Sequence, residues 1–204
     1  MRFILNVILF MQTNKVIGSK VKSIRESRNL SVEEVAERSG VSIELIERIE
    51  GDIEIPSLAP LIKIARVMGV RLGTFLDDND KLGPVVSRAI DNKDKNTIRF
   101  TDDSTLPRKH MEYHSLSQDK AGRHMEPFLI DIHTAQQSDY TLSTHEGEEF
   151  IYVLEGVIEV KYGKETYILN AGDSIYYDSI VAHHVHAAKD GAPAKILGVV
   201  YTPA

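Results

Sequence analysis

Apolar residues in the first third of the chain recur with a helical period. Over residues 16–76 they lie three or four positions apart in five short runs, with polar residues between them. Ser31 and Ser42 precede two of these runs, and Glu34 follows Ser31 at the spacing of a capping box. Glycines follow the ends of the same two runs. The pattern predicts an all-α domain of five short helices over residues 16–76.

The pattern changes after residue 96 to short apolar runs without a helical period. Turn sequences such as Y-G-K and N-A-G-D separate them. We expect nine strands, which begin near residues 97, 110, 126, 140, 149, 157, 165, 174 and 195. They predict an all-β domain over residues 97–204, built as a small antiparallel barrel or jelly roll. Residues 77–96 are polar and turn-rich, which is typical of a linker.

Charge separates the same two regions. Residues 1–76 contain 11 Lys and Arg against 9 Asp and Glu, whereas residues 77–204 contain 13 against 21 and all eight histidines. The chain has no cysteine, so disulfides, thiolate nucleophiles and cysteine zinc sites are excluded. We therefore expect a cytoplasmic protein of two domains with different roles, a multidomain α + β chain.

The first 15 residues form an N-terminal extension. Its apolar opening, M-R-F-I-L-N-V-I-L-F-M, is too short to span a bilayer and lacks a cleavage site of small residues. Met11 offers a second start. We interpret residues 1–10 as an upstream-start artefact or a disordered extension rather than a membrane anchor, and expect no membrane partner.

A long run beginning at Ile17 has the features of a known DNA-binding domain. The run I-G-S-K-V-K-S-I-R-E-S-R-N-L-S-V-E-E-V-A-E-R-S-G-V-S-I-E-L-I-E-R-I-E-G resembles the Xre-type, lambda-repressor-like helix-turn-helix domain. The resemblance continues through P-S-L-A-P-L-I-K-I-A-R-V-M-G-V. It implies that residues 42–50 form the recognition helix, that Arg25 and Glu50 pair as structural residues, and that a homodimer binds a double-stranded DNA operator.

The recognition helix has side chains that the core does not need. Glutamate can accept a hydrogen bond from cytosine, an apolar side chain can contact a thymine methyl, and arginine can bind guanine or phosphate. The alternative is that Ile43 only packs and the glutamates are solvated surface. Because acidic side chains repel DNA, phosphate contacts are expected from the first helix. The predicted DNA-binding residues are Ser42, Ile43, Glu44, Glu47 and Arg48, with Lys20, Lys22 and Arg28 for phosphate.

Two runs in the β region resemble the cupin motifs. S-T-H-E-G-E-E-F-I-Y-V-L-E-G, which begins at Ser143, resembles the first motif, and G-D-S-I-Y-Y-D-S-I-V-A-H, which ends at His183, resembles the second. The resemblance spans about residues 97–202 and implies that His145, Glu149 and His183 hold one metal ion at the mouth of a small β-barrel. Ser143 stands where the family has a further His.

The residue types of this cluster allow two kinds of site. Two imidazoles and one carboxylate with open positions suit Fe, Mn, Ni or Zn. A serine hydroxyl is a poor ligand for these ions but a good hydrogen-bond donor to a carboxylate or carbonyl group. We predict a ligand pocket, with or without a divalent metal, lined by Ser143, His145, Glu149, Tyr177 and His183. His184 and His186 are expected on the opposite face of their strand.

Two main functions fit these patterns. In the first, the protein is a transcriptional regulator without catalytic residues, whose cupin domain senses a small-molecule effector and biases the DNA-binding dimer. The alternative is a mononuclear non-haem iron enzyme resembling the fosfomycin-forming epoxidase, a family that also joins a helix-turn-helix-like domain to a cupin. Its iron is held by a His, a Glu four residues later and a distant His. The intact helix-turn-helix pattern favours the regulator over this enzyme and over an interaction scaffold.

Overall fold

The chain folds into two compact units, one of helices and one of strands. A computed structural model describes residues 17–53, 57–77, 82–88, 97–99, 111–133, 142–188 and 192–203. The helical unit reaches Leu76, and the β unit begins at Asp77, the first residue of the predicted linker. The predicted N-terminal extension and most of the linker lie outside the described residues. No helix among the described residues is both long and apolar enough to cross a membrane.

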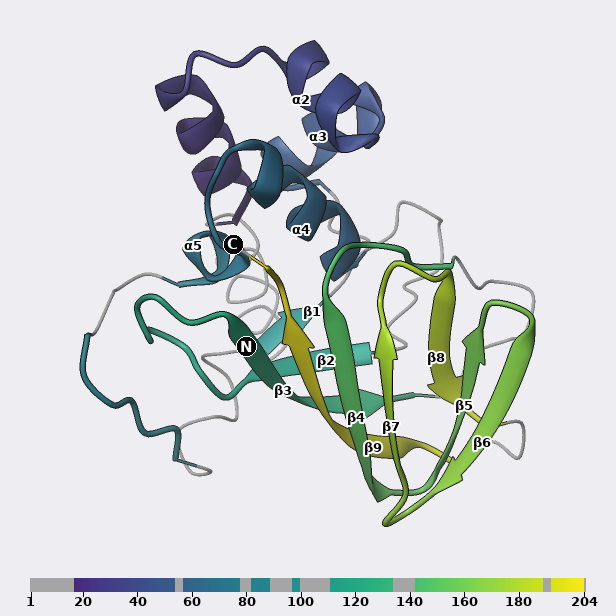
Figure 1. The fold of residues 1–204 in the computed structure, drawn as a ribbon. Coiled ribbons are helices and arrows are strands. Elements are labelled where there is room, and N and C mark those ends of the chain that lie inside the picture. Colours follow the sequence, from purple (N-terminus) through teal and green to yellow (C-terminus); the bar gives the residue numbers. More distant parts are fainter. Residues whose placement is uncertain are drawn as a thin grey trace, which may run out of the picture. The chain divides into compact units, whose positions relative to one another are not determined.

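The five helices of the first unit lie where the apolar period predicts them (Figure 1). The first covers residues 17–27, and the others are α2 (Val32–Ser39), α3 (Ile43–Glu50), α4 (Leu58–Val67) and α5 (Leu72–Leu76). Their inward residues form one apolar core, which includes the fully buried Val21, Val35, Ile46, Ile49, Leu61, Ile64 and Phe75.

The helix ends confirm the predicted caps. Ser31 Oγ accepts a hydrogen bond from the Glu34 amide, and the Glu34 carboxylate accepts one from the Ser31 amide, so the capping box is complete. Ser42 Oγ accepts from the Leu45 amide at 3.2 Å at the start of α3. These bonds satisfy amides that have no partner within the helix, and they fix where α2 and α3 begin.

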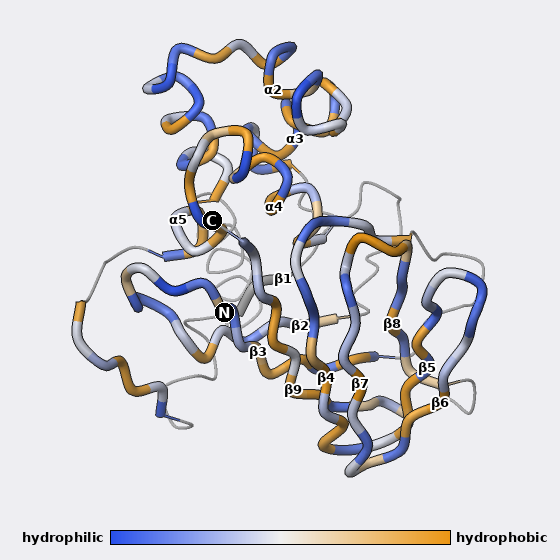
Figure 2. Tube along the Cα trace, viewed as in Figure 1, coloured by the Kyte–Doolittle hydropathy of each residue, from blue (hydrophilic) through white to orange (hydrophobic). Residues whose placement is uncertain are grey.

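The β unit contains nine described strands in two antiparallel sheets. The strands are β1 (Thr97–Arg99), β2 (Met111–Ser115), β3 (Met125–Ile132), β4 (Glu148–Glu155), β5 (Val157–Tyr162), β6 (Glu165–Asn170), β7 (Ser174–Asp178), β8 (His183–Ala187) and β9 (Ala194–Tyr201). One sheet has the order β1-β2-β3-β9-β4-β7, and the other has the order β6-β5-β8. Their inward side chains share a core, and Figure 2 shows hydrophobic stretches along β3, β9 and β5.

The strand prediction was wrong at one element. Of the run predicted to begin at residue 140, the first two residues lie outside the described residues, and Ser143 forms only an isolated bridge with His183. The ninth strand is instead β8, which starts at His183 and was not among the predicted runs. Its sequence, H-H-V-H-A, is too polar for the apolar pattern to detect.

Candidate metal centre and recognition helix

The backbone of the β unit brings His145 and His183 together from segments far apart in the sequence. The bridge between Ser143 and His183 has N–O distances of 2.8 and 2.9 Å. Gly147 then turns the chain into β4 with a φ of +104°, and a Cβ at this position would lie 1.9 Å from the carbonyl oxygen of Tyr201. Only glycine therefore allows this turn, which places Glu149 beside both histidines.

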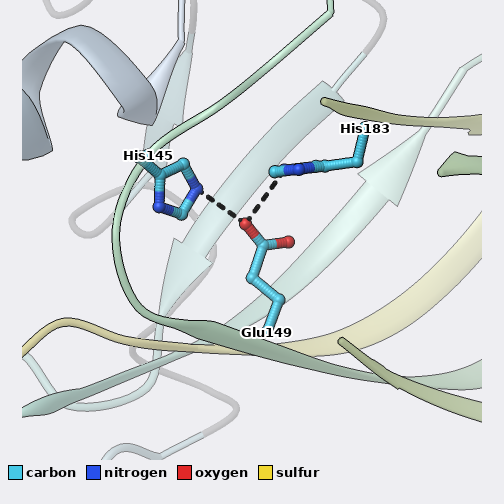
Figure 3. A group of neighbouring side chains, drawn as sticks. All are labelled: His145, Glu149 and His183. Atoms are coloured by element: carbon cyan, nitrogen blue, oxygen red, sulfur yellow. Dashed lines mark hydrogen bonds and ion pairs between the residues drawn. The ribbon is translucent and has the colours of Figure 1, made fainter. Parts of the chain in front are cut away.

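His145, Glu149 and His183 point toward one another (Figure 3). The Nε2 atom of His145 lies 2.8 Å from Glu149 Oε1, and the Nε2 atom of His183 lies 3.4 Å from the same oxygen. The three side chains are 3%, 16% and 4% exposed, respectively. Their potential ligand atoms all lie within 4.8 Å of one another.

Backbone carbonyls hold the other nitrogen of each imidazole ring. Nδ1 of His145 lies 3.0 Å from the carbonyl oxygen of Glu146, and Nδ1 of His183 lies 2.8 Å from that of Val181. A carbonyl can only accept, so each Nδ1 donates its hydrogen. In the neutral rings, both Nε2 lone pairs then face the cluster. Metal-binding histidines are commonly oriented by such a contact.

Tyr177 holds the second oxygen of Glu149. It lies directly across from Glu149 in the β4–β7 register, and its hydroxyl donates a 2.7 Å hydrogen bond to Glu149 Oε2. Its buried ring packs against His183, with 5.1 Å between ring centroids. The carboxylate therefore presents Oε1 to the histidines while Tyr177 binds Oε2.

The electrostatics of the cluster favour an ionised Glu149 carboxylate. Burial opposes ionisation of Glu149, but hydrogen bonds from His145, His183 and Tyr177 outweigh it and hold its pKa below the usual range. Burial alone would lower the pKa of His183, yet its contact with Glu149 raises it. Burial and the negative charge of Glu149 both raise the pKa of Tyr177. Tyr177 therefore stays protonated and able to donate.

The donor set fits a divalent metal. Two oriented imidazole nitrogens and one carboxylate oxygen converge in a nearly buried site, and the remaining atom of each donor group already has a partner. Fe, Mn, Ni and Zn accept this mixture of nitrogen and oxygen ligands. Ser143, the fifth residue of the predicted pocket, is placed here by its backbone bridge to His183.

Sequence reasoning missed Tyr113, a half-buried tyrosine on the inward face of β2. Its ring packs edge-on against Phe128 in the core, at 5.5 Å between centroids. Burial and the charge of Glu149 raise its pKa. Alternation along β2 was the signal that could have identified it, since Tyr113 and Ser115 share the inward face.

His184 and His186 lie on the other face of β8, as strand alternation predicts. Their rings stack with 5.4 Å between centroids, and Nε2 of His186 lies 3.5 Å from a carboxylate oxygen of Glu159. Burial lowers the pKa of His186. Neither residue belongs to the cluster around Glu149.

Helix α3, the predicted recognition helix, exposes part of the predicted DNA-binding set. Ser42, Glu44 and Glu47 are exposed, and Ile43 is 41% exposed. Arg48 is half-buried. On the first helix, Lys22 is exposed and Lys20 is half-buried, and Arg28, predicted on this helix, is exposed in the turn that follows it. Ser42 Oγ accepts the hydrogen bond that caps the helix.

The predicted structural pair is present behind this surface. Arg25 Nε and Nη2 donate to the two carboxylate oxygens of Glu50 at 2.6 and 2.9 Å, and Nη1 donates to the Leu30 carbonyl. The two-bond geometry ties the first helix to the end of α3.

Comparison with known proteins matches each unit separately. A helix-turn-helix family model matches residues 21–75, and a cupin domain model matches residues 131–200. The chain is 26% identical over 168 residues to the HTH-type transcriptional regulator PuuR of Escherichia coli, covering 81% of this chain and 84% of that protein. It is 28% identical over 151 residues to (S)-2-hydroxypropylphosphonic acid epoxidase of Streptomyces wedmorensis, covering 70% of this chain and 73% of the enzyme.

A solved structure has the same fold over nearly the whole chain. An HTH_3 family transcriptional regulator from Vibrio cholerae has a TM-score of 0.66 at 23% identity, covering 95% of this chain and 99% of its own. The Fe(II) form of the epoxidase has a TM-score of 0.50 at 23% identity, covering 93% and 100%. The chain therefore joins an N-terminal Xre-like helix-turn-helix domain to a C-terminal cupin domain.

Proposed function

We propose that this protein is a cytoplasmic, DNA-binding transcriptional regulator whose cupin domain binds a divalent metal and a small-molecule effector. The observation that supports it best is the presence in one chain of an exposed recognition helix and a buried, preorganised donor cluster. Two transcriptional regulators match over four fifths of the chain. In this function the cupin domain has no catalytic role.

The helical unit supplies the DNA-binding part of the proposal. Its core is complete and its caps are formed, so α3 has a fixed start from which Ile43 and Glu44 project outward. Recognition helices of this kind contact base edges with their N-terminal residues. Lys22 on the first helix and Arg28 in the turn after it are exposed and can bind phosphate.

The cupin unit supplies the sensing part. His145, Glu149 and His183 would hold the metal, which when bound supplies positive charge and open coordination positions for an anionic or carbonyl-bearing effector. The chain's own groups fix the donors: the Glu146 and Val181 carbonyls orient the rings, and Tyr177 holds the carboxylate. A ligand bound here can regulate DNA binding if it favours one state of the dimer.

The iron enzyme is the second candidate. It is favoured by the His-x3-Glu spacing of the cluster with a distant His, and by the 28% identity to the epoxidase. In that case the iron-loaded protein would consume oxygen in the presence of a suitable organic substrate. The regulator predicts no such turnover.

DNA binding provides the decisive test. We expect the full chain to bind DNA from upstream of its own gene with an affinity that falls as salt rises, in a fluorescence-anisotropy titration. Arg48→Ala and Ile43→Ala should each weaken binding by about 1–3 kcal/mol. Lys164→Ala, in the β5–β6 turn, is the matched control and should change nothing. Absence of specific binding at low salt, together with iron-dependent oxygen consumption, would establish the enzyme instead.

A further inference from the structure

The chain passes from the helical unit to the β unit between two buried residues. Phe75 of α5 is fully buried in the core of the helical unit, and Asp77, the first residue of the β unit, is buried although the sequence predicts a linker there. Only Leu76 lies between them in the chain. A carboxylate is almost never fully buried unless it has a partner. The partner of Asp77 therefore determines how this junction is held.

That partner is Arg123, 46 residues further along the chain. Its Nη1 and Nη2 atoms donate to the two carboxylate oxygens of Asp77, and the side chains of Arg123 and Asp77 are 7% and 5% exposed. Nη1 also donates to the carbonyl oxygen of Lys120 at 3.0 Å, in the loop between β2 and β3. Two parallel bonds between guanidinium and carboxylate fix the orientation of both groups. We call the Asp77–Arg123 pair the junction clamp.

The guanidinium of the clamp also contacts the inner wall of the β unit. Arg123 Nε donates to Glu126 on β3 at 2.8 Å. In the strand register, Glu126 lies opposite Val200 on β9, which lies opposite Glu149 on β4. Because neighbouring strands are about 4.8 Å apart, β3 lies about 10 Å from the strand that carries the carboxylate of the metal cluster. The buried Val200 is the residue between the two carboxylates in this row.

The charges around the clamp are not balanced. Two carboxylates, Asp77 and Glu126, share the single positive charge of Arg123, and all three side chains are almost fully buried. Glu149 adds a further carboxylate to the same row. Like charges repel strongly in a protein interior. The release of Asp77 into water therefore costs less than the opening of a balanced buried pair, which would leave one charge uncompensated.

A divalent cation held by His145, Glu149 and His183 changes this balance. Its positive charge lies at one end of the row that contains Glu126, and it attracts the carboxylates of the clamp. Release of Asp77 then moves a negative charge away from the cation, which makes the open state of the clamp less favourable. A ligand that binds one of two states more tightly shifts the equilibrium toward that state.

We propose that the junction clamp couples metal binding in the cupin domain to helix α5. Bound metal keeps Asp77 on Arg123, and loss of the metal favours its release. Because Asp77 follows α5 directly, its release frees the end of a helix of only five residues, which is too short to be stable by itself. The inference rests on the proposed function for the metal in the cluster, and it adds the residues through which that metal acts on the helical unit.

Hydrogen–deuterium exchange of the full chain, measured by mass spectrometry with and without zinc, tests the coupling. In the wild type, zinc should slow exchange of the α5 amides by at least about five-fold, the lower end of typical coupling between two sites. In Asp77→Asn, which keeps the shape of the side chain, zinc should leave α5 exchange unchanged. Asp131→Asn is the matched control. It breaks an ion pair with Lys195 on the outward face of β3, and it should respond to zinc as the wild type does.

Zinc affinity provides a second measurement, because coupling between two sites is reciprocal. Calorimetry should show that Asp77→Asn binds zinc more weakly than the wild type by a factor similar to the change in α5 exchange, whereas Asp131→Asn should not differ. Arg123→Lys retains the charge but cannot make both bonds to Asp77, and it should reduce both effects. It serves as the second variant if circular dichroism shows that Asp77→Asn is not folded.

The outcomes distinguish the clamp from the proposed function. Zinc binding by the wild type without a change in α5 exchange overturns the clamp and leaves the metal-binding regulator standing. An equal response of Asp77→Asn and Asp131→Asn to zinc has the same meaning. If the wild type binds no zinc, or if His145→Ala binds it equally well, the clamp and the metal site of the proposed function are both wrong.

Discussion

Glu50 in the helical unit and Glu149 in the β unit are both carboxylates held by cationic or potentially cationic partners, but the partners differ in kind. Glu50 receives two hydrogen bonds from one guanidinium, Arg25, whose remaining Nη1 donates to a backbone carbonyl. Glu149 contacts two imidazoles and one phenol. A guanidinium is charged at every accessible pH and has no lone pair, whereas an imidazole gains and loses a proton and can bind a metal.

This difference separates a structural pair from a candidate functional site. Removal of either residue of the Arg25–Glu50 pair leaves a charge in the domain without its partner, and no ligand can replace it. In the cluster around Glu149, a metal ion can take the place of the proton shared between carboxylate and imidazole. A buried charge alone therefore does not identify a functional site. The chemistry of its partner, which can or cannot titrate and bind a metal, decides whether the pair is structural or functional.

The largest effect is expected from removing a donor of the cluster. His145→Ala should weaken metal binding by more than about 100-fold, because even outer partners of metal ligands are worth 10- to 100-fold. Metal analysis of protein purified without chelator measures it. His184→Ala is the matched control, since His184 lies on the opposite face of β8. Equal metal content in the wild type and His145→Ala would refute the metal site.

Breaking the Arg25–Glu50 pair should lower stability and leave metal binding unchanged. Arg25→Met leaves the Glu50 carboxylate without its two donors, and should lower the free energy of unfolding of the helical unit by about 3 kcal/mol. Urea denaturation followed by circular dichroism would measure the loss. Replacing both residues, as Arg25→Met with Glu50→Leu, should recover most of it. A fall in metal content in either variant would contradict the separation of the two roles.

The helical unit was predictable because its signals are local. Caps such as Ser31 and Ser42 act within three residues, and apolar side chains at helical spacing can only face one core. Even the Arg25–Glu50 pair follows from the resemblance to the family. The β unit was predictable in class but less so in its elements, because β8 consists largely of polar residues that pair with β5.

The candidate site shows where sequence reasoning ends. His145 and Glu149 are four residues apart, so their proximity can be anticipated, and His183 follows from the second motif. The contact between Tyr177 and Glu149 Oε2 depends instead on the β4–β7 register, which no local pattern determines.

The role of Tyr177 can be tested without removing a metal donor. Tyr177→Phe keeps the ring against His183 and removes only the hydroxyl that binds Oε2. Metal affinity should fall by about 10- to 100-fold, the range for outer partners of metal ligands. Titration with Mn or Zn by calorimetry measures it. Tyr162→Phe removes a hydroxyl that donates to the Asp178 carbonyl, and serves as the control. Equal affinities in the two variants would show that Tyr177 only packs.

Glu126 is a third buried carboxylate, and its properties are intermediate between those of Glu50 and Glu149. Glu126 is 2% exposed and accepts a 2.8 Å hydrogen bond from Arg123 Nε. The same guanidinium also binds the carboxylate of Asp77, so one positive charge serves two negative ones. Burial is the main reason that the pKa of Glu126 rises to about 6, and the Asp77 charge contributes. This guanidinium partner does not keep the carboxylate fully ionised.

That shift predicts a pH dependence of stability. Because the pKa of Glu126 is about 6 in the folded state, against 4.5 for an ordinary glutamate, the folded state binds more protons than the unfolded state between these values. The contribution of Glu126 to stability is therefore present below pH 4.5 and is lost as pH rises through 6. The loss amounts to at most about 2 kcal/mol.

Glu126→Gln should remove this contribution. Urea denaturation between pH 4.5 and 6 measures the unfolding free energies of wild type and variant. As pH rises, the wild type should lose up to about 2 kcal/mol relative to the variant. Glu112→Gln, on the outward face of β2, is the control and should track the wild type. If the difference between wild type and Glu126→Gln is independent of pH, Arg123 keeps Glu126 ionised. Glu126 would then belong with Glu50, and sharing a guanidinium would not make a buried carboxylate titratable.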